Sequence, residues 1–213
     1  MTLNVLKKNL GIYGANTYIL YDDKKEAVVI DCGGDADEVQ KMLNEHDLKP
    51  LALILTHGHF DHIAGMNNLR EITGAPIYGC EKERDLFEDA QNNLSQSTLV
   101  GPITLKCDHY FNDGDELKFG DIKLKVLATP GHTEGSVCLY NDEMIFTGDT
   151  LFNRSVGRSD LYSGNQAHLN ESLKKMRDMF DGKLIVYPGH GPESTMKFEV
   201  ENNPYITCLL YTS

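Results

Sequence analysis

The chain has 213 residues, of which 40% are hydrophobic, and its formal net charge is −12. The acidic charge disfavours nucleic acid or an anionic membrane as the main partner, because both attract basic surfaces. No stretch reaches the roughly 18 apolar residues of a membrane helix, and lysines interrupt the short apolar run near the N-terminus, unlike a secretory signal. We therefore expect a cytoplasmic protein with a single domain over residues 1–213 and a core over about residues 1–200.

The first half of the chain alternates predicted strands and helices. Runs rich in β-branched and aromatic residues predict strands, and apolar residues at helical spacing predict helices. The predicted elements are strands over 16–21 and 27–31, a helix over 35–48, a strand over 51–56, a helix over 63–74, a strand over 76–79 and a helix over 81–93. The run LALILT (51–56) is apolar throughout, which indicates a strand buried on both faces.

The second half repeats this mixture of strands and helices. Alternating Leu117 and Phe119, followed by a turn at Gly120-Asp121, predict a hairpin within 115–133. Next come predicted strands over 136–140 and 143–149, an amphipathic helix over 165–180 and a strand over 184–190. Two similar halves of this kind predict two sheets packed together, with helices outside. The sequence has no CxxC pair, so we expect the cysteines to be small buried apolar residues: Cys32, Cys80, Cys107, Cys138 and Cys208.

The segment THGHFDH places His57, His59, Asp61 and His62 within six positions, directly after the buried strand. The carboxyl ends of such strands are where α/β sheets build their sites. In an extended chain, residues i and i+2 point the same way, so His57 and His59 can bind one ion. Asp61 and His62 follow where the chain turns into a helix and can face a neighbouring position. Imidazole and carboxylate groups are good ligands for zinc and iron, so the segment predicts a metal site.

Three more ligand-type residues lie at predicted strand ends beside Gly or Pro: His132 in TPGHT, Asp149 in FTGDT and His190 in YPGHG. Each alone is typical of a turn. Together with the first four they supply about three ligands for each of two ions, with one carboxylate that can be shared. His46, His109 and His168 lack this context, and we expect them to be surface or helix residues.

The order and spacing of THGHFDH, TPGHT, FTGD and YPGHG resemble the metallo-β-lactamase fold superfamily over roughly residues 1–200. The resemblance implies an α/β fold, a four-layer αββα sandwich. It also implies that His57, His59 and His132 hold metal one, that Asp61, His62 and His190 hold metal two, and that Asp149 bridges both. The cofactors would be two divalent ions, zinc in the first place, with iron or manganese as alternatives.

Two further segments, GDTLFNRSVGRSDLYSGN (148–165) and GHGPEST with EVENNPYI (189–206), resemble the glyoxalase II-like branch in its short, single-domain bacterial form. That branch cleaves glutathione thioesters, typically S-D-lactoylglutathione, to acid and thiol. The resemblance implies that Arg158 contacts the glutathione moiety, although a surface salt bridge is the other interpretation of this residue. We do not expect the C-terminal helical domain with which full-length glyoxalase II completes its glutathione site.

The predicted ligands suggest a mechanism. Two divalent ions can lower the pKa of a bridging water from about 15.7 to about 7, and the resulting hydroxide would attack the thioester carbonyl. Metal one would stabilise the oxyanion, metal two would receive the thiolate, and Asp61 would be the catalytic residue that orients the hydroxide and accepts its proton. The sequence has no GxSxG nucleophile. We expect Thr56, Gly58, Thr133 and Gly148 to support the ligand turns, and Asp31 either to orient a ligand histidine or to cap its strand.

Other functions remain open. The element GRSD (157–160) also occurs in mononuclear iron persulfide dioxygenases, which would use His57, His132 and Asp149 around one iron. Hydrolysis of another ester or of a lactone is a third enzyme hypothesis, and a β-lactamase is disfavoured by the missing export signal. A non-catalytic metal- or ligand-binding module is the alternative from another class. We expect a small-molecule thioester as the partner, and the oligomeric state is open.

Overall fold

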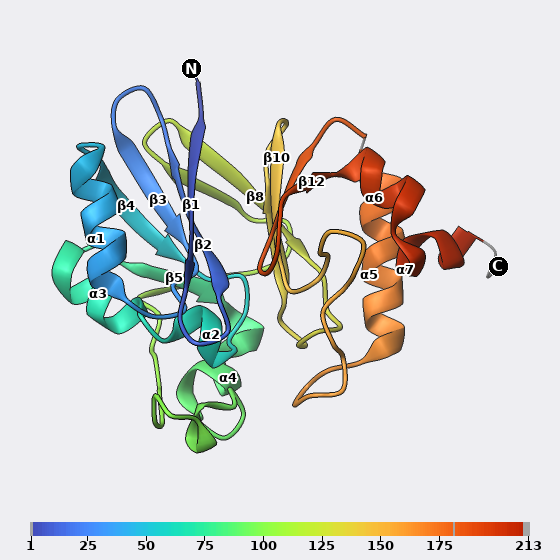
Figure 1. The fold of residues 1–213 in the computed structure, drawn as a ribbon, viewed down its shortest axis with the longest axis horizontal. Coiled ribbons are helices and arrows are strands. Elements are labelled where there is room, and N and C mark those ends of the chain that lie inside the picture. The colour runs from blue at the N-terminus through green and yellow to red at the C-terminus, as the bar shows by residue number, and fades with distance from the viewer. Residues whose placement is uncertain (1, 181, 211–213) are drawn as a thin grey trace.

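Two six-stranded sheets form the centre of the computed structural model, which describes residues 2–180 and 182–210 (Figure 1). The first sheet has the order β1 (Asn4–Leu10), β2 (Ala15–Tyr21), β3 (Glu26–Ile30), β4 (Lys49–Ile54), β5 (Ile77–Cys80) and β6 (His109–Phe111). The second has the order β12 (Ser194–Thr195), β11 (Ile185–Pro188), β10 (Met144–Gly148), β9 (Val137–Tyr140), β8 (Ile122–Ala128) and β7 (Glu116–Phe119). Strands β3 to β6 are parallel, as are β10 and β11, and the other pairs are antiparallel.

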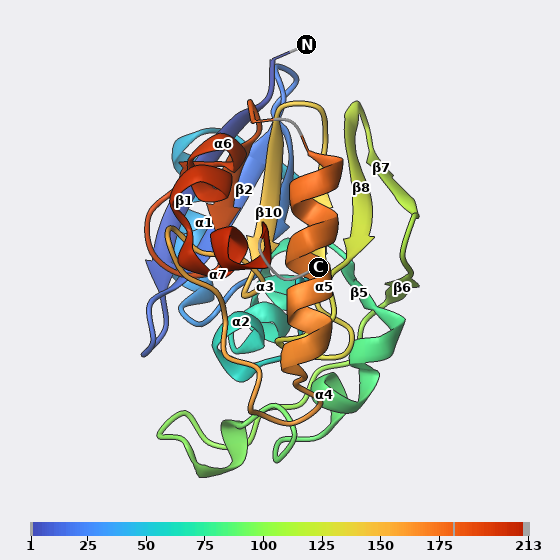
Figure 2. The same cartoon turned by 90° about the vertical axis from the view of Figure 1, so that its right-hand side faces the viewer.

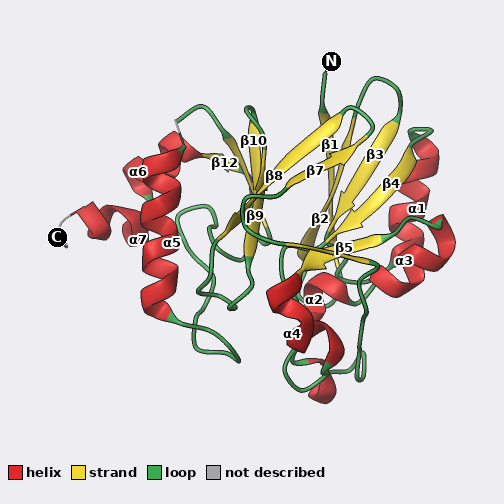
Figure 3. Cartoon of the chain, turned by 180° about the vertical axis from the view of Figure 1, so that it is seen from behind, coloured by secondary structure: helices red, strands yellow, loops and turns green. Residues whose placement is uncertain are grey.

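Helices cover the outer face of each sheet, so the chain forms the predicted αββα sandwich (Figures 1 and 3). The α-helices are α1 (Ala36–Glu45), α2 (Phe60–Ile63), α3 (Met66–Thr73), α4 (Arg84–Glu88), α5 (Gln166–Met179), α6 (Met196–Asn202) and α7 (Pro204–Thr207). Short 3₁₀ helices span Glu81–Glu83, Ser95–Ser97 and Cys208–Leu210. Helices α1 and α3 lie on the first sheet, and α5 with α6 and α7 lies on the second. No helix in the described part of the chain is long and apolar enough to cross a membrane.

Side-chain alternation along the strands creates the separate apolar layers. On β3, Val28 and Ile30 pack between the two sheets, whereas Val29 points the other way into a cluster with Val39 of α1 and Leu69 of α3. Both faces of these central strands are therefore buried, which explains why LALILT has no polar alternation.

The second sheet is built in the same way. Leu124 and Val126 of β8 face the first sheet, while Leu127 turns outward and packs with Leu169 and Leu173 of α5. Figure 2 looks onto this outer side, where α5 runs across β8 and β10. The predicted hairpin is confirmed, because β7 pairs with β8 around Gly120, which has a left-handed φ of 59°.

Several predicted elements differ from the structure. The helix predicted over 81–93 consists only of the 3₁₀ turn and α4, because the Asn93 side chain donates to the carbonyl oxygens of Leu86 and Ile103 and holds the chain in a loop. The helix predicted over 63–74 is α3, which begins only at Met66, and residue 63 ends the separate helix α2. The backbone of Cys32 bonds both the His62 carbonyl and the Gly65 amide and so separates the two helices. Strands β1, β6 and β12 at the sheet edges were not predicted.

Candidate metal centre

The seven predicted ligand residues lie in turns and in one short helix at the same end of the sandwich, although they are spread over most of the chain. His57 and His59 follow β4, and α2 carries Asp61 and His62. The other three follow β8, β10 and β11 in the second sheet: His132, Asp149 and His190. Those three strands run in the same direction, so their carboxyl ends reach the same edge and meet the end of β4.

Three histidines form the first group. The ligand atoms of His57, His59 and His132 lie within 4.8 Å of one another, and all three side chains are buried. Burial lowers the pKa of His57 well below its usual value and that of His59 to about 3, so both rings are neutral. His59 Nδ1 and His132 Nε2 are only 2.8 Å apart, and buried His57 Nε2 has no hydrogen-bond partner among the described residues. Converging imidazole nitrogens of this kind fit a cation placed between them.

Asp61, His62 and His190 form the second group, again with ligand atoms within 4.8 Å of one another. His190 Nε2 lies 3.3 Å from Asp61 Oδ2 and 3.4 Å from His62 Nε2. Burial opposes the charged form of His62, but the carboxylates of Asp149 and Asp31 raise its pKa well above the usual value. A field that favours positive charge this strongly also favours a metal cation at the same place.

Asp149 lies between the two groups. Its Oδ1 is 3.2 Å from His62 Nε2, and its Oδ2 is 3.5 Å from His132 Nε2 and 3.6 Å from His190 Nε2. Burial alone would raise the pKa of this carboxyl, but the neighbouring histidines, His62 above all, lower it well below its usual range. An ionised carboxylate between two ligand groups has the geometry of a shared ligand, so the donors fit two adjacent divalent ions.

Comparison with known proteins identifies the family. The model of the metallo-beta-lactamase superfamily matches residues 10–190, which is most of the chain and all seven residues of the centre. The chain belongs to the metallo-β-lactamase superfamily.

Relatives in this superfamily include "Probable metallo-hydrolase YqgX" of Bacillus subtilis, 35% identical over 92% of this chain and 94% of the relative. "Hydroxyacylglutathione hydrolase GloC" of Haemophilus influenzae is 33% identical over 90% of this chain and 92% of its own. Among solved structures, the BLEG-1 B3 metallo-beta-lactamase has a TM-score of 0.90 at 38% identity, covering 96% of this chain and 100% of its own. TTHA1623 in a di-iron-bound form has a TM-score of 0.81 at 31% identity, covering 94% and 99%. Family and centre together indicate a metal-dependent hydrolase.

The metallo-β-lactamase centre of this chain is supported by a buried carboxylate next to the ligands. Asp31, only 2% exposed, accepts hydrogen bonds from the Thr56 amide (2.8 Å), from the Thr56 hydroxyl (2.7 Å) and from His62 Nδ1 (2.8 Å). It therefore holds the His62 ring, as expected for a residue that orients a ligand histidine, and leaves Nε2 to face the second group.

Sequence reasoning missed the support of the His190 turn. Asn16 on β2 donates to the carbonyl oxygens of Pro188 (2.7 Å) and Gly191 (3.0 Å), and the Tyr18 hydroxyl also donates to Pro188 (2.7 Å). The turn approaches the centre closely, because a Cβ on Gly189 would lie 2.2 Å from Asp149 Oδ1. The available signal was a polar residue, Asn16, at a strand position that alternation predicts to be buried.

A cavity of about 420 Å³ opens over the centre, lined by His59, Asp61, His132 and Asp149 together with Tyr13, Phe60, Leu94, Thr98, Phe152, Gly157, Arg158 and Leu161. Arg158 lies at this cavity, but its guanidinium makes two bonds to Asp160, at 2.7 and 2.9 Å, and its side chain is 62% exposed. The backbone of Arg158 contacts the centre more directly, because its carbonyl accepts from His132 Nδ1 at 2.6 Å. In the structure the Arg158 guanidinium therefore forms a surface salt bridge, as in the second interpretation of this residue.

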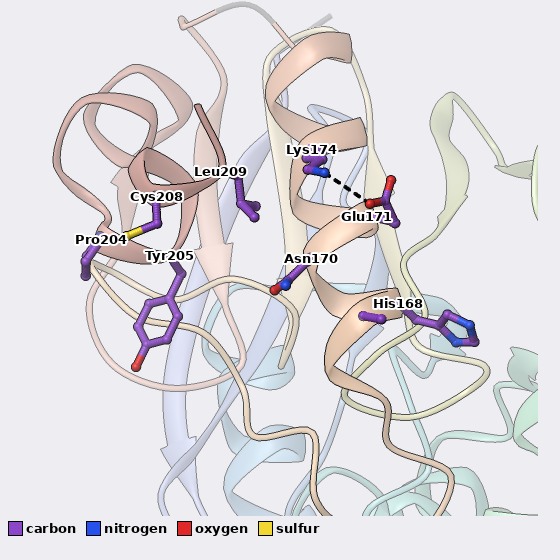
Figure 4. Close-up of a pocket in the computed structure, with 9 residues that line it drawn as sticks. His168, Asn170, Glu171, Lys174, Pro204, Tyr205, Cys208 and Leu209 are labelled. Carbon is purple, nitrogen blue, oxygen red and sulfur yellow. Dashed lines mark hydrogen bonds and ion pairs between the residues drawn. The ribbon is translucent and has the colours of Figure 1, made fainter. Parts of the chain in front are cut away.

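A larger cavity, about 590 Å³, lies elsewhere, between α5 and the C-terminal helices (Figure 4). It contains none of the seven ligand residues, and we do not connect it with the chemistry. His168 lies at its edge and is exposed, as are His46 and His109, so these three are outside the centre as predicted. The cysteines are buried as predicted except Cys208, which is exposed on the final 3₁₀ turn, so the prediction for that residue was wrong.

Proposed function

We propose that the protein is a metal-dependent thioesterase of the glyoxalase II type, with S-D-lactoylglutathione or a related acyl-thiol as substrate. We further propose a small molecule, rather than nucleic acid or a membrane, as its partner. The observation that carries the proposal is the pair of complete ligand groups with Asp149 between them. The thioester itself is supported by the similarity to a relative named as a hydroxyacylglutathione hydrolase.

Two divalent ions, held by the groups described above with zinc as the first candidate, would activate water and polarise a carbonyl. We assign the catalytic carboxylate to Asp61, and its membership of the second group and its place in the cavity lining support this assignment. Burial raises the pKa of Asp61, but the bond to His190 and the charge of His62 outweigh this effect and lower it, so the carboxylate is ionised and can accept a proton. The leaving thiolate is a weak base and needs no dedicated acid.

The completeness of the second group favours this proposal over a mononuclear iron dioxygenase, which needs only His57, His132 and Asp149. A second hydrolytic candidate is β-lactam cleavage, supported by the 38% identity to a B3 metallo-beta-lactamase. Both reactions would use the same centre and differ in what the cavity admits.

The test is a thiol-release assay on metal-loaded protein with S-D-lactoylglutathione and thioesters of other thiols. A chromogenic β-lactam and oxygen uptake with glutathione persulfide serve as the competing arms. We expect thiol release with about two metals per chain, and loss of turnover in Asp61→Ala at saturating metal. Fully metallated protein that hydrolyses no thioester would contradict the proposal, and so would undiminished turnover in Asp61→Ala.

A further inference from the structure

Glu83 is a fully buried carboxylate beside the metal centre that is not one of its ligands. It ends the 3₁₀ turn Glu81–Glu83 and has an exposed fraction of 0%. Its Oε2 accepts a hydrogen bond from the Gly58 amide at 2.7 Å, and its Oε1 accepts one from the Gly135 amide at 2.8 Å. The Thr133 side chain also hydrogen-bonds to it.

These donors belong to the two turns that carry the first ligand group. Gly58 lies between His57 and His59 after β4 of the first sheet. Thr133 and Gly135 follow His132 after β8 of the second sheet. One carboxylate therefore joins ligand turns that come from different sheets.

We propose that Glu83 is a positioning residue for metal one, which sets the approach of His57 and His59 to His132 before the ion binds. His59 Nδ1 and His132 Nε2 lie only 2.8 Å apart, so the approach of these two ligand rings depends on support that holds their turns together. Hydrogen bonds from both turns to one anion provide that support. The inference goes beyond the proposed function, because it concerns metal uptake and holds whatever the substrate is.

The chemistry of the site favours a carboxylate over an amide. An ionised carboxylate only accepts hydrogen bonds, so both oxygens can face N–H groups. In Glu83→Gln, one amide NH₂ would have to face the Gly58 or the Gly135 N–H, donor against donor. Burial raises the pKa of Glu83 to about 7 even though the hydrogen bonds from Thr133, Gly58 and Gly135 favour the ionised form, so without these bonds it would be higher still.

The space around the carboxylate is equally restrictive. A Cβ on Gly135 would lie 2.7 Å from Glu83 Oε1, and a Cβ on Gly58 would lie 3.2 Å from Glu83 Oε2. Gly135→Ala therefore disturbs the same bridge from the opposite side while keeping a glutamate at position 83. This gives a second variant that does not depend on the folding of Glu83→Gln.

The experiment measures zinc affinity directly, by competition with a chromogenic chelator, together with the d–d absorption spectrum of the cobalt-substituted protein. We expect Glu83→Gln and Gly135→Ala to weaken one of the two binding steps by about 10- to 100-fold, the usual effect of losing an outer-sphere partner. A His190→Ala background, which lacks a ligand of the second group, shows which ion is affected. In that background one ion remains, and Glu83→Gln and Gly135→Ala should weaken the affinity for it by the same factor. The other step should change by less than about threefold.

Glu199→Gln is the matched control. Glu199 is also fully buried, and it accepts from the Arg154 amide (2.9 Å) and from Asn203 Nδ2 (2.8 Å), but it touches neither ligand turn. Both bonds go to Oε2, and Oε1 has no hydrogen-bond partner among the described residues, so an amide fits there and we expect the variant to leave the fold and the affinity for metal one unchanged. The proposal is overturned if Glu83→Gln and Gly135→Ala lower the melting temperature but keep both zinc affinities, or if they weaken both steps equally. Neither result depends on thioesterase activity, so failure here is distinct from failure of the proposed function.

Discussion

Substitution of Asp31 by asparagine tests how the second ion is held. Asp31 Oδ1 accepts from the Thr56 amide, and Oδ2 accepts from both the Thr56 hydroxyl and His62 Nδ1. Asparagine has the same shape and tolerates the left-handed backbone of this position, where φ is 56°. The fold should therefore survive, and the effect should come from the replacement of an acceptor by a donor.

Neither orientation of the new amide satisfies its surroundings. With its oxygen toward the Thr56 amide, its NH₂ faces His62 Nδ1, which must then become the acceptor and move the ring proton to Nε2. That nitrogen is the one that faces His190 and Asp149, so the tautomer is wrong for binding an ion. With the amide reversed, its NH₂ faces the buried Thr56 N–H. We expect a loss of about 10- to 100-fold in affinity for the second ion, or about 1.4 to 2.7 kcal/mol.

Zinc titration against a chromogenic chelator measures this loss, with the melting temperature of the metal-free protein as a check on folding. Asp22→Asn is the control, because Asp22 is 1% exposed and accepts from the Lys24 and Glu26 amides through Oδ1 alone. In the part of the chain that the structure describes, nothing hydrogen-bonds to its Oδ2, so an amide fits there. Two ions bound to Asp31→Asn with the affinity of the unmodified protein would refute the role assigned to Asp31.

Three other predictions follow from the same structure. Removal of metal by a chelator should abolish hydrolysis and lower the melting temperature, because an ion at about 1,000 times its Kd contributes about 4 kcal/mol of stability. An unchanged melting temperature after verified metal loss would argue against the histidine groups as the metal site. Burial raises the pKa of the Cys80 thiol to about 11 and those of Cys32, Cys107 and Cys138 to about 12. A thiol reagent at about pH 8 should therefore react rapidly with Cys208 alone in the folded protein. After denaturation it should react with all five cysteines. Rapid reaction of a second thiol in the native state would contradict the buried positions. Arg158→Ala should raise KM for S-D-lactoylglutathione by up to about fivefold with kcat unchanged, because an exposed ion pair is worth at most about 1 kcal/mol; an equal rise for a thioester of an uncharged thiol would show that Arg158 does not recognise glutathione.

Much of the fold could be predicted because it depends on short-range patterns. The hairpin around Gly120 needs only alternation and a turn residue, and the burial of β4 on both faces is visible in LALILT. The edge strands β1 and β6 were missed because an edge strand is specified by its neighbour. β1 pairs with β2 over Asn4–Leu10 yet contains two lysines and two asparagines, a pattern that also suits an exposed loop.

The sequence by itself determined the types of ligand and their local order, because the spacing of His57, His59, Asp61 and His62 follows from the geometry of a strand that turns into a helix. The tertiary structure decided which side chains hold those ligands in place. Glu83 meets Gly58 and Gly135 from 25 and 52 positions away, and Asn16 reaches Pro188 across 172 positions. Such contacts exist only after the two sheets have packed face to face, and the sequence around a buried glutamate or asparagine does not show which distant backbone group it will bind. The residues that show the chemistry are therefore local, and the residues that position it are not.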